Sequence, residues 1–337
     1  MGASRRDSLR LLAAGAAGLG LTRTCLAAAD PPPETTRLRL SRVATICLAP
    51  QYIAEALLRG EGFTDIQYIG DGPSHTGIPG ARAMGSGEID IAMNFAAPLV
   101  IALDQGVPIT LLGGVHVGCF ELFGAASVRS IKDLKGKTVA TLGKGSAQQV
   151  FVASIAASVG IDPMRDIRWA DMRNPEGKAL LAEERIDAYL AFPPDAQELR
   201  ARKVGHVLLN SAIDRPWSQY FCCLLSANRE FVRSNPVATR RAMRAILKAS
   251  EICASDPDLG VKAFLARGFS TDTAIARQAI TELTSYGHWR EYNPEETVRF
   301  YALRLREAEM VKASPQELIA HGTDWRTLEQ LKREMKT

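Results

Sequence analysis

The stretch TLGKGSAQQVFVASI, residues 141–155, has the residue types of a phosphate-binding loop. Two glycines, a lysine and a serine follow an apolar run and precede a helical pattern. A nucleotide-hydrolysing loop needs its lysine directly before a hydroxyl residue, but Lys144 stands before Gly145 and Ser146 comes after that glycine. A dinucleotide-binding fingerprint needs a third glycine where Gln148 stands. The spacing therefore excludes both nucleotide-binding motifs.

What remains at residues 143–148 is a strand end, a glycine turn and the N-terminus of a helix. Free backbone N–H groups and the helix dipole make such a corner a binding place for an anion or a polar ligand. The same residues also fit a tight strand-to-helix turn that Ser146 caps. Both interpretations stay open until the surrounding elements are considered.

These elements are typical of an α/β protein, because strand-like and helix-like segments alternate from residue 38 to residue 228 and predict a largely parallel sheet. The segment 37–45 predicts the first strand, and 89–93 and 138–142 predict buried strands. After residue 228 the pattern is helical throughout, and several helices open with Asp, Ser or Asn followed by Pro. The first helix, at residues 50–63, is expected to bury one face, formed by Ile53, Ala56, Leu57 and Phe63.

The first 29 residues predict an export signal. Arg5 and Arg6 form a twin arginine, and the apolar run LLAAGAAGLGL that follows is too short to span a bilayer. Three alanines at 27–29 offer a cleavage site, and three prolines in the linker 30–37 follow it. We therefore expect export to the periplasm by the twin-arginine route.

Charge and cysteine content exclude some classes of protein. The net charge of +4 falls to +1 without residues 1–29, which leaves no basic excess for a nucleic-acid partner. The remaining cysteines form no CxxC pair and no zinc-type spacing with His, so we expect buried free thiols and no metal or other cofactor. These cysteines are Cys47, Cys119, Cys222, Cys223 and Cys253.

Four segments resemble the bacterial extracytoplasmic solute-binding proteins of the nitrate, sulfonate and taurine type (the SsuA/THI5-like, NMT1 superfamily). The segment SIKDLKGKTVAT, residues 130–141, is similar to the one that opens their second domain. The others are GSGEIDIAMNFAAPLVIALDQGVPITLLGG, ERIDAYLAFPPDAQEL and FVRSNPVATRRAMRAILKA. The order and spacing of the segments carry the resemblance from residue 39 to about residue 312.

This resemblance implies a two-lobed periplasmic binding protein of type II, with lobe 1 at 38–124 and 226–337 and lobe 2 at 125–225. Two crossovers, near Gly124 and Leu225, join the lobes, and the C-terminal helices cover lobe 1. Such a protein is no enzyme: as a monomer it captures a small molecule and delivers it to an ABC transporter permease with a partner ATPase.

Ligand-binding candidates lie where strands end, because α/β sheets bind ligands at the carboxyl ends of their strands. The candidates are Ile46, Cys47, Leu48, Asn94, Phe95, Ala96, Gly114, His116, Gly145, Ser146, Ala147 and Phe192. Cys47 and Phe192 could instead be packed core residues, and Asn94 could instead form a turn. His116 is expected to form hydrogen bonds and not to bind metal, because no second ligand is near it in the sequence. Only Lys144 supplies a cation at a strand end, so we expect a small organic ligand with one anionic or polar head.

Two other functions remain open. The stretch FCCLL, residues 221–225, is similar to the cysteine-rich motif of the pyrimidine synthases of thiamin biosynthesis, which use lysine-bound pyridoxal phosphate. Those enzymes are cytosolic and have a longer cysteine cluster, so the export signal and the two cysteines here count against that activity. A sensor lobe that feeds a membrane signalling partner would have the same sequence features as a transport protein.

Overall fold

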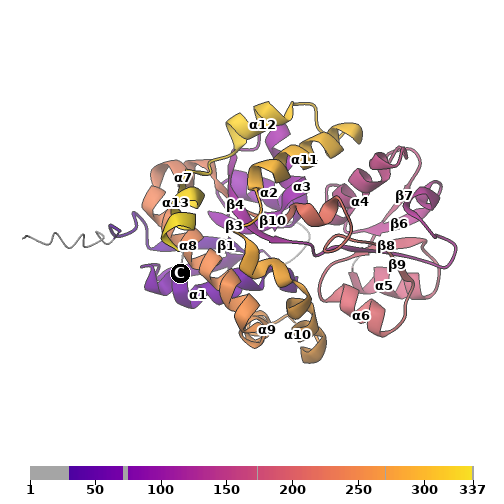
Figure 1. Cartoon of the computed structure of the whole chain (residues 1–337), viewed down its shortest axis with the longest axis horizontal. Coiled ribbons are helices and arrows are strands. Elements are labelled where there is room, and N and C mark those ends of the chain that lie inside the picture. Colours follow the sequence, from indigo (N-terminus) through magenta and orange to yellow (C-terminus); the bar gives the residue numbers. More distant parts are fainter. Residues whose placement is uncertain (1–29, 71–74, 173, 270, 336–337) are drawn as a thin grey trace, which may run out of the picture. The chain divides into compact units, whose positions relative to one another are not determined.

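The computed structural model describes residues 30–70, 75–172, 174–269 and 271–335. The predicted signal at 1–29, with Arg5 and Arg6, lies outside the described residues. Strands and helices alternate as far as residue 228 and helices alone follow, as the sequence pattern predicts (Figure 1).

Ten strands form the sheets in the described part of the chain, and most begin or end within a few residues of the predicted segments. They are β1 (Arg37–Ser41), β2 (Asp65–Ile69), β3 (Ile91–Phe95), β4 (Ile109–Val117), β5 (Glu121–Gly124), β6 (Thr138–Thr141), β7 (Arg168–Asp171), β8 (Ala188–Ala191), β9 (His206–Asn210) and β10 (Phe221–Asn228).

The helices lie between and after these strands. They are α1 (Ala49–Gly60), α2 (Gly77–Gly85), α3 (Ala96–Asp104), α4 (Ala147–Ser158), α5 (Asn174–Ala182), α6 (Asp195–Ala201), α7 (Arg229–Ser234), α8 (Pro236–Ser255), α9 (Pro257–Leu265), α10 (Thr273–Glu282), α11 (Pro294–Glu307), α12 (Pro315–Gly322) and α13 (Arg326–Glu334). Short 3₁₀ helices are η1 (Ile46–Leu48), η3 (Ile131–Leu134), η4 (Trp217–Gln219) and η5 (Thr284–His288).

The strands build two separate layers of sheet. In one layer β1 pairs with β2 in parallel, and β10 lies antiparallel between β3 and β4; in the other the order is β7-β6-β8-β5-β9. There β7, β6, β8 and β9 run in one direction, and β5 runs antiparallel to its neighbours β8 and β9. Most strands of each layer thus share one direction, as predicted, and β5 and β10 are the exceptions. The strands that carry the chain between the layers, β5 and β10, enter each sheet against the direction of their neighbours.

Sheet membership moves the predicted lobe boundaries by a few residues. Glu121–Gly124 pairs with β8 and β9, so this strand belongs to the five-stranded sheet although the prediction assigned it to lobe 1. The strand that starts at Phe221 pairs with β3 and β4. We propose that lobe 2 comprises residues 121–220 and that lobe 1 comprises the remainder from residue 38.

The first helix buries a different face from the predicted one. Ala56 is exposed and Ile53 and Leu57 are only partly buried, whereas Tyr52, Ala54 and Leu58 belong to the core. The helices α8 and α9 pack on α1. The whole first turn of α1, residues 49–52, is buried, and the buried face continues through Ala54 and Leu58. Phe63, just beyond the helix, is fully buried as predicted.

The helices after β10 cover lobe 1. The helix α8 packs on α1 and on η5, α11 packs on α3 and α12, and α13 contacts β4 (Figure 1). Helices also join the lobes, because α11 and α3 both pack on α4 and α10 reaches α6. Among the described residues, no helix combines the length and the apolar character needed to cross a membrane.

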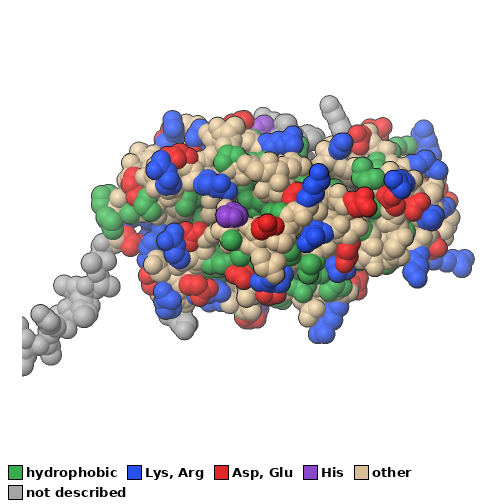
Figure 2. All heavy atoms as spheres, turned by 90° about the horizontal axis from the view of Figure 1, so that it is seen from above, with side chains coloured by type: hydrophobic (Ala, Val, Ile, Leu, Met, Phe, Trp, Pro, Cys, Tyr) green, Lys and Arg blue, Asp and Glu red, His purple; other side chains and the backbone are tan. Residues whose placement is uncertain are grey.

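One face of the molecule carries charges of both signs. Lysine and arginine side chains alternate there with aspartate and glutamate, over both lobes (Figure 2). A mixed pattern of this kind gives this face no single-sign field that would steer a nucleic acid toward it.

A polar cluster joins α6 of lobe 2 to α10 of lobe 1. Gln197 Nε2 donates to Glu282 Oε2 at 2.8 Å, and Arg200 forms an ion pair with the same carboxylate. The guanidinium of Arg200 also lies 3.6 Å from Oε2 of the buried Glu121, beyond hydrogen-bonding range. Glu121 is thus held between the lobes with one oxygen unpaired among the described residues.

This burial predicts a pH effect on stability. Burial raises the pKa of Glu121, which Arg200 partly offsets. A carboxyl whose pKa is higher in the folded protein stabilises the fold while protonated, and that stability is lost as the pH rises toward the folded pKa. The Glu121→Gln variant should therefore gain a few tenths to about 1 kcal/mol in unfolding free energy at neutral pH and nothing near pH 4. Urea unfolding at several pH values measures this difference.

The matched control is Glu183→Gln, which replaces an exposed carboxylate that pairs with Arg185. This control should leave the pH profile of stability unchanged. Equal profiles for Glu121→Gln and the wild type would contradict the assignment.

Candidate functional site

The residues after β1 meet the other lobe directly. Thr45 Oγ1 donates to the carbonyl oxygen of Pro193 at 3.0 Å, and the backbone N–H of Ile46 donates to the same oxygen at 3.2 Å. Cys47 and Leu48 follow in η1 and are buried. The predicted residues Ile46, Cys47 and Leu48 therefore lie at or directly behind a contact between the lobes.

Two predicted aromatic residues also meet across the lobes. Phe95 ends β3 and Phe192 follows β8, and their ring centroids are 6.0 Å apart. Phe120, on the connection into β5, lies 5.0 Å from Phe95 and 4.6 Å from Phe151 of α4. The sequence did not single out Phe120 or Phe151, because each reads as an ordinary core residue in its own element.

The glycine turn before α4 is a capped helix start, and it also touches lobe 1. Ser146 Oγ accepts from the backbone N–H of Gln149 at 3.3 Å, and Gly145 N–H donates to Gln149 Oε1 at 2.7 Å. The carbonyl oxygen of Gly145 accepts from the N–H of Ile78 in α2, at 3.1 Å. Ala147 is buried at the first position of the helix. Both interpretations of this turn thus have support: Ser146 caps the helix, and the turn borders the other lobe.

A side chain that the sequence did not indicate stands at this corner. Gln148, in the first turn of α4, is 2 % exposed, and its Nε2 group has no hydrogen-bond partner among the described residues. A buried donor without an acceptor is costly and is uncommon in folded proteins. Gln148 Nε2 is therefore available to a ligand with an acceptor atom.

Asn94 and Ala96 flank Phe95 at the end of β3. Asn94 is 8 % exposed, and its Oδ1 accepts from the N–H of Phe95 at 2.9 Å, which is a local turn-type bond. Its Nδ2 makes no hydrogen bond to the part of the chain that the structure describes. Ala96 is buried as the first residue of α3.

Gly114 packs into the sheet of lobe 1. It lies within β4, and a Cβ atom there would come 2.2 Å from the ring of Phe221. The predicted strand, residues 107–116, ends within one residue of β4, which continues to Val117 and places Gly114 inside the strand. We therefore leave Gly114 out of the ligand site.

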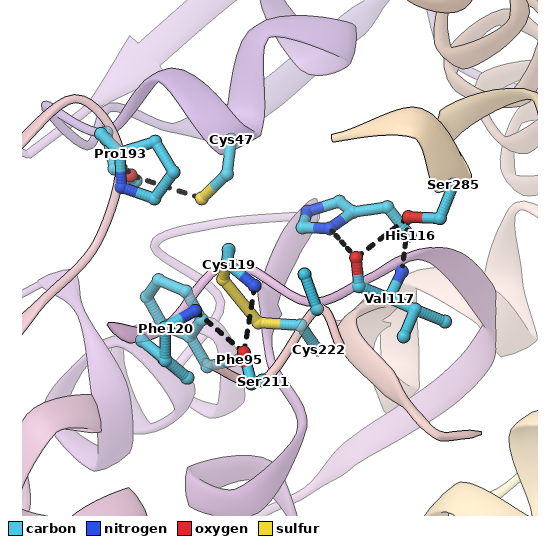
Figure 3. The surroundings of a disulfide bond; sticks show 12 residues. Cys47, Phe95, His116, Val117, Cys119, Phe120, Pro193, Ser211, Cys222 and Ser285 are labelled. Atoms are coloured by element: carbon cyan, nitrogen blue, oxygen red, sulfur yellow. Dashed lines mark hydrogen bonds between the residues drawn. A yellow bond between two sulfur atoms is a disulfide. The ribbon is translucent and has the colours of Figure 1, made fainter. Parts of the chain in front are cut away.

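His116 is fully buried near two cysteines. Ligand atoms of Cys47, His116 and Cys223 all lie within 4.8 Å of one another. The argument that no second metal ligand is near His116 is therefore wrong: both cysteines are distant in the sequence, and the fold brings them to it. Figure 3 shows His116 with one ring nitrogen directed at the carbonyl oxygen of Val117.

The expectation of free thiols holds for only part of the set. Cys119 and Cys222 form a disulfide, with Cα atoms 6.6 Å apart, whereas Cys47, Cys223 and Cys253 are free and buried (Figure 3). The sequence offered no sign of this pairing, because Cys119, between β4 and β5, and Cys222, at the start of β10, are 103 residues apart.

The two central thiols differ in acidity. Burial raises the pKa of Cys47, but its close neighbours Cys223, His116 and Thr45 outweigh burial and lower this pKa below its ordinary value. Burial and the neighbouring Cys47 raise the pKa of Cys223. One thiol of the pair is thus the preferred place for a negative charge.

Residues 32–264 match the family model of the NMT1-like family. The chain belongs to the NMT1-like family. A search of curated proteins finds no significant match.

Solved structures place this family member among periplasmic binding proteins in fold. The periplasmic nitrate-binding protein NrtA from Synechocystis PCC 6803 superposes with a TM-score of 0.75 at 14% identity, over 91% of this chain and 90% of that one. The alkanesulfonate-binding protein SsuA from Xanthomonas axonopodis pv. citri, bound to MOPS, gives 0.64 at 19%, over 88% and 100%. The ligand-binding component of an ABC-type import system from Staphylococcus aureus, with zinc bound, gives 0.68 at 13%, over 88% and 99%. The predicted two-lobed α/β fold is confirmed.

Proposed function

We propose that this NMT1-like protein is an extracytoplasmic solute-binding protein that captures a small organic ligand between its lobes. It delivers the ligand, as a monomer, to an ABC permease with its ATPase. The observation that carries the proposal is the meeting of strand ends from both sheets, Phe95 with Phe192 and Thr45 with Pro193. A ligand that contacts both lobes stabilises their closed arrangement, which is the signal that a permease can recognise.

The side chains at the corner support a ligand with a polar or singly anionic head. Gln148 Nε2 is a buried donor without a partner among the described residues, at the N-terminus of a helix whose dipole favours negative charge. Asn94 Nδ2 can add a second donor from lobe 1. Lys144 is exposed, so it is free to attract an anion but is not a buried clamp for one.

The aromatic side chains support an apolar or aromatic body. Phe95, Phe120 and Phe192 form one group across the lobes, and Phe151 of α4 extends it. Aromatic rings favour stacked or edge-on partners, so a flat ring system suits this group better than a long alkyl chain does. We therefore infer an aromatic carboxylate, or a neutral heterocycle with acceptor atoms, before nitrate or taurine.

The protein is proposed to act in the periplasm, exported by the twin-arginine signal at 1–29. The Cys119–Cys222 disulfide supports this location, because disulfides persist in oxidising compartments such as the periplasm.

A thermal-shift screen of the full chain tests the proposal. The panel holds aromatic carboxylates, aminopyrimidines, alkanesulfonates, taurine, nitrate and pyridoxal phosphate. One compound, recovered unchanged, should raise the Tm in proportion to the logarithm of its concentration above Kd. The Phe192→Ala variant should lose most of this shift, whereas Phe264→Ala, a core change in α9, should lower the Tm and keep the shift.

Two outcomes would favour other functions. Conversion of the compound, or a covalent pyridoxal phosphate absorbance, would indicate an enzyme and contradict the proposal. Ligand binding by a protein whose gene lies beside a kinase gene, and not beside a permease gene, would indicate a sensor.

A further inference from the structure

Three separate elements bring metal-ligating side chains to one buried point. Cys47 comes from η1, His116 from β4 and Cys223 from β10, and each residue is 0% exposed. Their ligand atoms all lie within 4.8 Å of one another. No other group of three with all its sulfurs free is found among the described residues.

The sheet of lobe 1 fixes two of these side chains. Cys223 and His116 are register partners on the antiparallel strands β10 and β4, so their side chains leave the sheet on the same face. The first turn after β1 lays Cys47 over this pair, and Thr45 Oγ1 lies 3.1 Å from the sulfur of Cys47. The cluster therefore depends on rigid elements and not on a loose loop.

The imidazole of His116 is oriented for a ligand. Its Nδ1 lies 3.5 Å from the carbonyl oxygen of Val117, and its ring packs edge-on against Tyr286 with centroids 5.1 Å apart. Tyr286 in turn donates from its hydroxyl to the carbonyl oxygen of Cys47 at 2.9 Å. Nε2 has no partner among the described residues. A histidine that directs one nitrogen at a backbone carbonyl and leaves the other free has the arrangement of a metal ligand.

We propose that Cys47, Cys223 and His116 bind one Zn²⁺ ion inside lobe 1. Two thiolates and an imidazole suit zinc and exclude magnesium and calcium, which prefer oxygen ligands. Around tetrahedral zinc the ligand atoms stand about 3.3–3.8 Å apart, so any pair near the 4.8 Å limit has to move closer when the ion binds. Three protein ligands leave the fourth position to an exchangeable group.

Binding is a proton exchange without oxidation or reduction. Two Zn–S bonds and one Zn–N bond form, and each thiol that starts protonated releases its proton to solvent. The second sulfur cluster, Cys119, Cys222 and Cys223, does not serve this purpose. Two of its sulfurs are bonded to each other, so they are not thiolate ligands.

This site goes beyond the proposed transport function, because it does not depend on which ligand the lobes capture. It lies just behind the contact between the lobes, where Thr45 and Ile46 donate to Pro193. Separation of the lobes breaks those two hydrogen bonds, which gives the ion a way in.

The test is metal binding by the full chain, purified without strong reductant under anaerobic conditions. Titration with Zn²⁺ against a chromophoric chelator should give one tight site, and Zn²⁺ should raise the Tm. Co²⁺ in its place should give thiolate-to-cobalt charge-transfer absorption and the intense visible bands of a tetrahedral site. The Cys47→Ser, Cys223→Ser and His116→Gln variants should each weaken zinc binding by more than about 100-fold, since even loss of an outer partner costs about 10–100-fold.

The matched control is Cys253→Ser, which removes another buried free thiol, from α8. This variant should keep the zinc affinity and the cobalt spectrum. Circular dichroism checks that each variant is folded. If a variant is unfolded, the cobalt spectrum of the wild type still tests the proposal.

Three results would overturn the proposal. One is a folded wild type without a tight zinc site, and another is an unchanged affinity in Cys47→Ser and Cys223→Ser. The third is a Cys47–Cys223 disulfide in peptide mass spectra of the unreduced protein. Loss of zinc binding with an intact ligand-induced Tm shift would leave the transport proposal standing, so the two proposals fail separately.

Discussion

The Gly77→Ala variant is expected to bind ligand about 5- to 150-fold more weakly than the wild type, because overpacking costs about 1–3 kcal/mol. A Cβ atom at Gly77 would lie 2.5 Å from the carbonyl oxygen of Gly145 and 3.0 Å from the N–H nitrogen of Ala147. Both atoms are backbone atoms of the α4 corner, so no change of rotamer relieves the clash. The lobes have to stay farther apart, and ligand contacts that need both of them weaken.

Strain at this glycine has to be separated from the clash. Gly77 has φ +61, which is unfavourable for alanine in any surroundings. Gly106→Ala carries the same kind of strain at φ +74, and its added Cβ meets nothing within 4 Å. Calorimetric titration should give Gly106→Ala wild-type affinity and a similar loss of Tm. Equal affinities for the two variants would mean that the α2–α4 contact plays no part in ligand capture.

The Gln148→Met variant is expected to gain stability and lose ligand affinity. Methionine removes the unpaired Nε2 donor at nearly constant volume, so the ligand-free protein should gain about 1–2 kcal/mol in unfolding free energy. The hydrogen bond to the ligand disappears as well, which should weaken binding by about 10- to 100-fold. Denaturant unfolding and calorimetric titration of the same samples measure both changes.

The neighbouring glutamine supplies the control. Gln149 accepts from the N–H of Gly145 through Oε1, so Gln149→Met removes a bond that is made and should destabilise the protein. Opposite signs of the two stability changes are the expected result. A destabilised Gln148→Met would show that Nε2 is satisfied in solution, and it would remove this residue from the ligand site.

Most elements could be predicted because their signals are local. The strand that ends at Phe95, the strand before Phe192 and the capped turn at Ser146 all show local signals, namely short apolar runs with turn residues at their ends. The candidates drawn from strand ends are therefore near the contact between the lobes. Gly114 lies inside its strand and not at the end, because β4 continues to Val117.

The remaining features depend on pairings that no local pattern encodes. Cys223 meets His116 only through the register of β10 against β4, and Cys47 reaches them from a different part of the chain. In the sequence Gln148 is an ordinary polar residue at the start of an apolar helix. That its Nε2 group is buried without a hydrogen-bond partner is visible only in the folded structure. The antiparallel direction of β5 depends on its pairing with β8 and β9, which come more than 60 residues later in the chain.

The Cys119–Cys222 disulfide joins the connection that enters lobe 2, between β4 and β5, to the start of β10, the strand that leaves it. The chain between these cysteines, which contains all five strands of that lobe, is thus a covalent ring closed at its base. A single cut anywhere in this ring opens it without releasing a fragment. Both halves of a cut lobe stay joined to the rest of the molecule, so a break in one of its surface loops does not detach any part of it.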